Sequence, residues 1–439
     1  MELVELLEEL VEEILLRIPP DEPAYLIRAT LVCKSWLRIL SDRDFLGRYR
    51  AFHRTPPLLG YFHNLYSRPG QIPRFVRTTS AASLFPEQVL GSSCWWALDC
   101  RHGRVLTRTY EPADRLVVFD PVTGDQHHLS VPTYPDNHLY TGAVLCAAMD
   151  ASCDHLNCHG GPFIVVFVGV SIDDDIRASV YSSETQTWGA STSLHPNRHH
   201  SIVDSRQSLL VGGMLYFTLS HGKSILRYEF GAHRLSVIDV DTCLSVIDVD
   251  TCLSVIDTPG VLLDNMVIAK ADDGGLGLIT VWNNRVYFWM QQQAGTNDSD
   301  DSPRRWVRHR VTEQINTLPP QHYRSYYPCS REVIGFAEDN DIIFINRDER
   351  VFMLDIKSMH VRKIGERQPY RTILPYVSFY TADALPLPLL SCQMLGHCWT
   401  LYGWMLCHCR QFGLFFDKCF YTMNMFDPSL TDALPLEFV

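Results

Sequence analysis

The sequence predicts an α+β multidomain chain in which a small all-α module of three to four helices precedes a mostly β, propeller-like domain. Two patterns support this prediction: helical spacing of apolar residues near the N-terminus, and strand–turn–strand units from about residue 90 onward. These units recur at roughly 45–65 residues, close to the repeat length of kelch-type propeller blades. We therefore divide the 439 residues into a helical domain (1–55), a linker (56–89), a propeller-like domain (90–375) and a Cys- and aromatic-rich tail (376–439).

The helical prediction rests on local signals in residues 1–55. Apolar residues at three- and four-residue steps, with acidic residues on the other side, indicate a first amphipathic helix. These apolar residues are Leu3, Leu6, Leu7, Leu10, Ile14 and Ile18. Pro19-Pro20 ends this helix because neither residue can donate a backbone N–H, and Asp21-Glu22-Pro23 suits the start of the next one. Apolar stripes at 24–40 and a capping candidate at Ser41-Asp42 complete the set of short helices.

The same stretch carries a contiguous residue pattern that closely resembles the F-box. The resemblance lies in Leu10–Pro20, Leu31–Trp36 and Leu40–Asp42, with matching spacings between them. One departure is Leu6-Leu7, which stands where the family usually has Leu-Pro at the start of the first helix. The segment Arg50–Gly60 resembles a subfamily common among grass-type plant F-box proteins.

The F-box resemblance implies a partner, because F-box helices dock on a Skp-type adaptor that links them to cullin and RING subunits. An apolar helical face that a small module cannot bury agrees with such docking, and the basic second half of the module suits an acidic adaptor. The motif positions that the resemblance assigns to the adaptor are Leu10, Ile14, Leu15, Ile18, Pro19, Leu31, Val32, Cys33, Trp36 and Leu40. The sequence leaves open which of them form the interface and which the core.

From about residue 90 the pattern changes to short strands separated by polar turns. The clearest strand–turn–strand units are Leu116–Gly124, Ala178–Trp188, Ile225–Gly231 and Val351–Ser358. Together with Arg101–Leu106, they resemble the propeller region that accompanies the F-box in this family. The alternative is an irregular β-sandwich, and the number of blades stays open.

A tandem repeat interrupts this region. The segment Leu235–Cys243 is repeated without change as Leu244–Cys252, and a partial third copy begins at Leu253. Because strand side chains alternate with period two and the repeat length is odd, identical residues in successive copies would face opposite sides of one strand. We therefore expect a loop or an added edge hairpin at 235–252, arising from a recent duplication or a sequence-assembly artefact.

Cysteine and histidine side chains gather at Cys146, Cys153, His155, Cys158 and His159. The spacing from Cys153 to Cys158 is Cys-x4-Cys, without the second pair that zinc sites usually have, so the sequence favours a loop with buried thiols over a metal site. The sequence also lacks a phosphate-cradling loop, a Gly-x-Ser-x-Gly elbow and a His-Glu-x-x-His helix. The prediction is a chain with no catalytic residues, no metal and no cofactor.

Composition limits the function classes further. The formal net charge of −12 disfavours nucleic-acid binding, and the acidic N-terminus and short apolar runs disfavour a secretory signal and a membrane span. We read the 14 cysteines as reduced thiols of a cytoplasmic or nuclear protein. The expected function is substrate recognition in an SCF-type (cullin–RING) E3 ubiquitin ligase, with a substrate protein held by the β domain and no covalent chemistry. The alternatives are a β-propeller binding or lectin-like protein and an F-box protein that acts outside a ligase.

Overall fold

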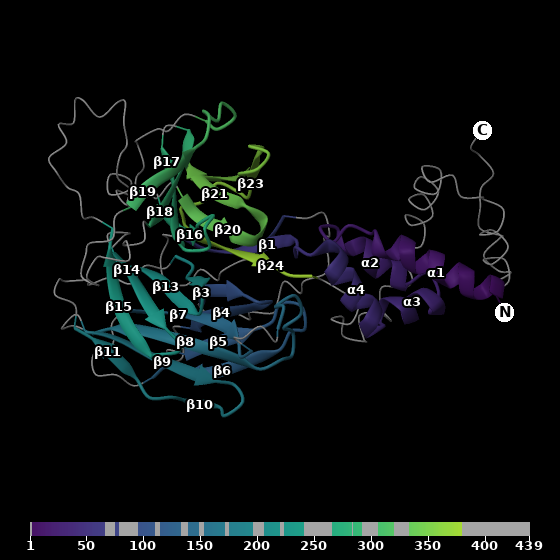
Figure 1. Ribbon diagram of the computed structural model, residues 1–439, viewed down its shortest axis with the longest axis horizontal. Helices are drawn as coiled ribbons and strands as arrows, with labels where there is room; N and C mark the ends of the chain where they lie inside the picture. The colour runs from purple at the N-terminus through teal and green to yellow at the C-terminus, as the bar shows by residue number, and fades with distance from the viewer. Residues whose placement is uncertain are drawn as a thin grey trace.

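In the computed structural model, a helical module lies beside a six-bladed β-propeller whose blades are six separate sheets (Figure 1). The structure describes residues 2–65, 75–78, 95–109, 115–132, 139–148, 153–171, 175–195, 206–219, 224–240, 266–282, 284–291, 306–319 and 333–379. The predicted fold class is confirmed, and the ring of six sheets excludes the alternative of an irregular sandwich. Within the described residues, none of the helices combines the length and apolar character needed to cross a bilayer.

The module consists of α1 (Glu2–Leu16), α2 (Pro23–Thr30), α3 (Lys34–Leu40) and α4 (Arg43–His53). As expected, α1 ends before Pro19-Pro20, and α2 begins with Pro23 in its first turn. The predicted cap at Asp42 is also confirmed. Its carboxylate accepts the backbone N–H groups of Asp44 at 2.9 Å and Phe45 at 3.0 Å, which would otherwise lack a partner at the start of α4.

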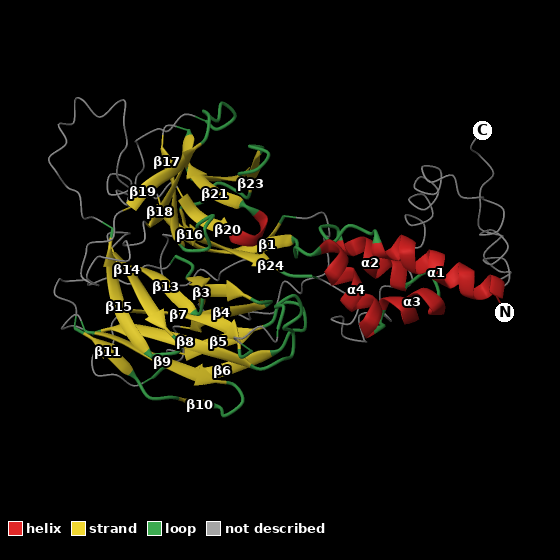
Figure 2. Cartoon of the chain, in the orientation of Figure 1, coloured by secondary structure: helices red, strands yellow, loops and turns green. Residues whose placement is uncertain are grey.

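The four helices, drawn in red in Figure 2, enclose one small apolar core. Its buried members are Leu15, Ile18, Leu26, Ala29, Ile39, Leu40, Phe45, Leu46 and Tyr49, together with Phe379 from the other end of the chain. The Tyr49 hydroxyl donates a hydrogen bond to the Ile18 carbonyl oxygen at 2.7 Å. Burial raises the pKa of Tyr49 far above its ordinary value, so the phenol remains a proton donor in this core.

Each of five blades is built on four consecutive strands, and consecutive strands pair within the blade. Their bounds are β3 (Trp95–Arg101), β4 (Arg104–Thr109), β5 (Arg115–Phe119), β6 (Gln126–Ser130); β7 (Leu139–Cys146), β8 (Phe163–Val170), β9 (Ile176–Ser182), β10 (Thr187–Trp188); β12 (Leu209–Val211), β13 (Met214–Leu219), β14 (Ser224–Glu229), β15 (Arg234–Asp239); β16 (Met266–Lys270), β17 (Leu276–Trp282), β18 (Arg285–Gln291), β19 (Trp306–Val311); and β20 (Val333–Ala337), β21 (Ile342–Arg347), β22 (Arg350–Asp355), β23 (Val361–Ile364). A short extra strand, β11 (Thr192–Leu194), also pairs with β9.

The remaining blade joins the two ends of the propeller sequence. Its order is β2-β1-β24, where β1 (Leu58–Leu65) and β2 (Phe75–Arg77) follow the helices and β24 (Tyr370–Val377) is the last strand. The register pairs Tyr61 with Pro375 and Phe62 with Leu374. Part of the segment that we expected to be a linker, 56–89, therefore belongs to the propeller, because the strand that pairs with it lies about 300 residues away.

The four predicted strand–turn–strand units contain third strands of blades and the turns that follow them, which confirms the pattern read from the sequence. In the first unit, the Asp120 carboxylate accepts the N–H groups of Val122 at 2.9 Å and Thr123 at 3.2 Å, closing an Asx-type turn. Gly124 then adopts a φ of 81° that a side chain would disfavour. Asp355 makes the same pair of backbone contacts in the last unit.

Part of the first nonapeptide copy forms the outer strand of its blade. Residues 235–239 lie in β15, where Leu235 pairs with Tyr228 of β14. The second copy, 244–252, lies outside the described residues, and so does the tail from residue 380 onward. The expectations of a looped insertion and of an atypical tail therefore stay predictions.

The helical module is packed against the propeller where β1 begins and β24 ends. Phe379 enters the helical core, where its ring lies edge-on to Tyr49 at a centroid distance of 6.2 Å. Leu156, from the loop between β7 and β8, packs against the same core. The Ser378 N–H donates to the Pro57 carbonyl oxygen at 3.2 Å, so the chain entering the propeller and the chain leaving it are tied together beside the helices.

Candidate functional site

The structure divides the ten predicted adaptor-binding residues into exposed and buried groups. Leu10, Ile14 and Val32 remain 49%, 46% and 38% exposed, and Pro19 and Cys33 are exposed as well. Leu10 and Ile14 are one helical turn apart on α1, so their side chains share one face of that helix. Exposed apolar side chains at motif positions are the expected signature of a protein-binding face.

Other members of the predicted set hold the module together. Leu15, Ile18 and Leu40 are 0%, 5% and 1% exposed, so they are core residues that can affect adaptor binding only through folding. Trp36 is half-buried and packs against this core, and Leu31 is half-buried too. The sequence pattern could not separate these groups because core and interface positions both lie on apolar stripes.

Polar contacts fix α1 against its neighbours beside the exposed face. Glu8 accepts a hydrogen bond from Arg38 of α3 at 2.8 Å, and the Ser35 hydroxyl lies 3.5 Å from the same carboxylate oxygen. On the next turn, Glu12 pairs with Arg48 of α4 at 2.5 Å. These pairs are solvent-exposed and contribute at most about 1 kcal/mol each, so they position α1 more than they stabilise the module.

Phe52 is an exposed apolar residue of the module that the sequence pattern did not single out. Phe52, near the end of α4, is 51% exposed, and its ring lies edge-on to the neighbouring His53 ring at a centroid distance of 5.0 Å. It lies outside the F-box motif positions. Its exposure is close to the 49% of Leu10, which makes it a matched control for the predicted face.

Charged residues at the ends of three strands form a second polar group, within the propeller. Arg101 ends β3, Lys270 ends β16 and Glu338 follows β20, and these are the first strands of their blades. Burial raises the pKa of Glu338, an effect that the nearby Arg101 guanidinium opposes. The Glu338 carboxylate also accepts the Lys270 backbone N–H at 3.2 Å. The arrangement places charged groups of both signs close together.

The structure brings together most of the Cys and His residues noted in the sequence. The side-chain ligand atoms of Cys146, Cys153, His155 and Cys158 all lie within 4.8 Å of one another. The absence of a second cysteine pair disfavoured a metal site in the sequence, but Cys146 at the end of β7 and His155 inside the loop complete a four-ligand set. His159 lies outside this set.

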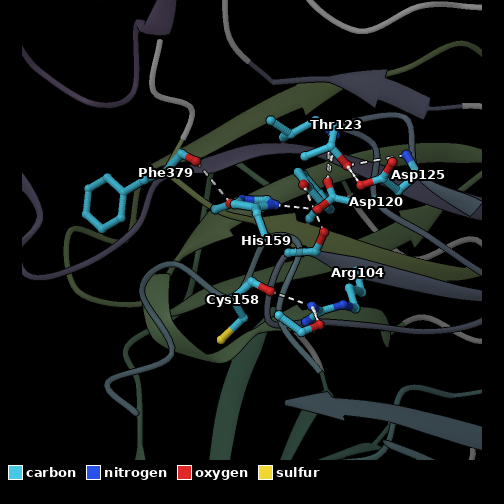
Figure 3. A network of polar contacts seen from close by, with 12 residues as sticks. Arg104, Asp120, Thr123, Asp125, Cys158, His159 and Phe379 are labelled. Carbon is cyan, nitrogen blue, oxygen red and sulfur yellow. Dashed lines mark hydrogen bonds and ion pairs between the residues drawn. The ribbon is translucent and has the colours of Figure 1, made fainter. Parts of the chain in front are cut away.

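His159 instead belongs to a Ser–His–Asp arrangement, of which Figure 3 labels His159 and Asp120. Its Nδ1 lies 2.5 Å from the Asp120 carboxylate, and its Nε2 lies 3.0 Å from the Ser378 hydroxyl. This order of groups is found in serine hydrolases, but a nucleophile must reach its substrate. Ser378 is only 6% exposed, and its hydroxyl also donates a hydrogen bond to the Phe379 carbonyl oxygen at 3.1 Å. The three residues therefore act as a structural clamp: their hydrogen bonds join the Asp120 turn, the β7–β8 loop and the chain at the end of β24.

The helical module and the propeller together define the class of the protein, an F-box protein with a β-propeller. The F-box domain model matches residues 3–47, and the model described as "F-box protein AT5G49610-like, beta-propeller" matches residues 96–380. The chain belongs to this AT5G49610-like family of F-box proteins. The plant-type F-box resemblance is thereby confirmed, while the kelch-type and grass-type details stay predictions.

Similarity to solved structures is remote. The chain matches a chain of a nidogen/laminin complex at 10% identity and a TM-score of 0.38, over 72% of this chain and 98% of that one. It matches the Cps50 (Swd1) β-propeller domain of Myceliophteria thermophila at 10% identity and a TM-score of 0.29, over 61% and 72%. It matches the WD40 domain of SCAP from fission yeast at 14% identity and a TM-score of 0.30, over 64% and 56%. A search of curated proteins gave no match.

Proposed function

We propose that this protein is the substrate-recognition subunit of an SCF-type (cullin–RING) E3 ubiquitin ligase. Its F-box binds a Skp-type adaptor, and its propeller binds a substrate protein. The observation that carries the proposal is that Leu10, Ile14 and Val32 occupy F-box motif positions and remain exposed, although the same helices bury an apolar core beside them.

In this role the protein supplies proximity and performs no covalent step. Binding adaptor and substrate at once raises the effective concentration of substrate lysines near the ubiquitin-charged enzyme. The packing of Phe379 and Leu156 into the F-box core supports this role, because a fixed propeller holds a bound substrate at a defined place relative to the adaptor.

The first experiment is co-purification of the full chain with a Skp-type adaptor. We expect a stable complex that is lost with Ile14→Asp and kept with Phe52→Asp. A correctly folded chain that does not bind the adaptor would overturn the proposal. Proximity labelling with and without residues 1–55, followed by an in-cell ubiquitination assay of the labelled proteins, then separates a ligase subunit from an F-box protein that acts outside a ligase.

The second candidate function is that of a hydrolase. It rests on one observation, which is that Asp120, His159 and Ser378 are hydrogen-bonded in the order of a catalytic triad. A fluorophosphonate probe reacts with an activated serine. We expect no labelling of the folded protein, because Ser378 is buried beside the F-box. Labelling that disappears with Ser378→Ala would support the hydrolase and contradict the clamp.

A further inference from the structure

The loop between β7 and β8 gathers three thiols and one imidazole into a single cluster. Cys146 is the last residue of β7, whereas Cys153, His155 and Cys158 follow within the loop. Cys146 and Cys158 are both 6% exposed, and Cys153 and His155 are half-buried. All three thiols are free.

The distances within the cluster fit tetrahedral coordination. Thiolate sulfurs lie about 2.3 Å from zinc, so two sulfurs of a tetrahedron are about 3.8 Å apart, and a sulfur and an imidazole nitrogen about 3.6 Å. The Cys153 and Cys158 sulfurs are 3.7 Å apart, and the Cys146 and Cys153 sulfurs 4.0 Å. The Cys158 sulfur lies 3.7 Å from His155 Nδ1.

The surrounding residues hold these side chains in place. His102 Nδ1 accepts the Cys146 backbone N–H at 3.1 Å, and the His102 ring stacks on the His155 ring at 4.1 Å with an interplanar angle of 11°. The His155 backbone N–H points to the Cys153 sulfur at 3.4 Å, at a residue whose φ of 57° turns the chain sharply. Such contacts orient ligands before a metal binds.

The charge of a zinc-bound cluster and the location of the loop are also consistent with a metal site. Zinc with three thiolates and one imidazole carries one net negative charge, and the Arg104 guanidinium lies beside the cluster, donating to the carbonyl oxygens of Cys158 and, at 2.6 Å, Gly161 (Figure 3). In the sequence, Leu156 lies between the ligands His155 and Cys158, and its side chain packs against the F-box core. The loop that carries the ligands is therefore also a contact between the propeller and the F-box.

We propose that Cys146, Cys153, His155 and Cys158 bind one structural zinc ion, which fixes the β7–β8 loop against the F-box module. Four protein ligands fill the tetrahedral coordination, so the ion has a structural and not a catalytic role. The ion holds Leu156 in its position on the helical core. This site is independent of the adaptor-binding face.

The test is the metal content of the full chain, purified under reducing conditions and dialysed against metal-free buffer. We expect the wild type to hold one zinc equivalent more than Cys153→Ser/Cys158→Ser, measured by plasma mass spectrometry. Cys33→Ser, which removes an exposed thiol of the F-box, should keep that equivalent. His155→Cys should keep it as well because a fourth thiolate replaces the imidazole, whereas His155→Ala should weaken binding.

Two further measurements keep the test decisive if the double variant folds poorly. Cobalt-substituted wild type should show thiolate-to-cobalt absorption in the near ultraviolet and tetrahedral d–d bands. His155→Ala, which removes one of the four ligands, should shift the d–d bands and require more cobalt to reach the same absorption. Removing zinc from the folded wild type with a chelator should speed amide hydrogen exchange in residues 153–161. Equal zinc content in wild type and the double variant, or a disulfide within the cluster in rapidly alkylated cells, would overturn the site.

Discussion

The exposed face of the F-box gives the sharpest test of the proposed function, through Ile14→Asp. Burying a whole isoleucine side chain contributes about 1.5–3 kcal/mol, so covering the 46% of Ile14 that is exposed contributes about 1 kcal/mol to adaptor binding. A carboxylate in that place loses this contribution and also costs at least about 2 kcal/mol of desolvation without a partner. The total of about 3 kcal/mol corresponds to a dissociation constant raised by a factor of about 100 or more.

The assay is calorimetric titration of the full chain with the purified adaptor, alongside thermal unfolding. Because Ile14 is half exposed, Ile14→Asp should lower the free energy of unfolding by no more than about 1–2 kcal/mol. The matched control is Phe52→Asp, which places the same charge at an apolar position of the same module with similar exposure (51% against 46%). The reasoning is refuted if Ile14→Asp binds within threefold of wild type, or if both variants lose binding equally.

Three other predictions concern the framework. Tyr49→Phe removes the buried hydrogen bond to the Ile18 carbonyl and should lower the free energy of unfolding by about 1–2 kcal/mol, measured by urea titration. Phe379→Ala should open a cavity in the F-box core and lower the free energy of unfolding by about 3–4 kcal/mol, with faster proteolysis between module and propeller, whereas Phe379→Leu should retain most of the packing. Burial raises the folded-state pKa of Asp99, so the stability linked to this group is present below its unfolded pKa of about 4 and is lost as the pH rises through the folded value. Asp99→Asn should therefore gain stability relative to wild type as the pH rises above about 4; a difference independent of pH would contradict this.

Local signals made the helices and several hairpins predictable. Proline fixes where α1 ends, and the Asp42 carboxylate marks where α4 begins, since both effects act within a few residues. The turn at Asp120 is local in the same sense, so the strands on each side of it could be read directly from the sequence. The number of blades depends on how the sheets are arranged around the ring and carries no such signal.

Features that depend on distant parts of the chain could not be predicted. β1 looks like part of a linker because its partner β24 lies about 300 residues away. The separation of Leu10 and Ile14 from Leu15 and Ile18 depends on how four short helices pack, and not on their hydrophobicity. The Cys146 thiol joins the other three ligands only because β7 ends beside the loop that follows it, a spacing that resembles none of the usual paired-cysteine motifs.

The contact between Phe379 and Tyr49 has a consequence for how the protein is made. The F-box leaves the ribosome first, yet one of its core residues comes from position 379, next to the strand that closes the ring. At roughly 5–20 residues per second, the intervening 324 residues (379 − 55) take about 15 to 65 s to synthesise. A nascent or prematurely terminated chain therefore carries an F-box with an unfilled core position beside Tyr49. The F-box is fully packed only in molecules whose propeller has been completed.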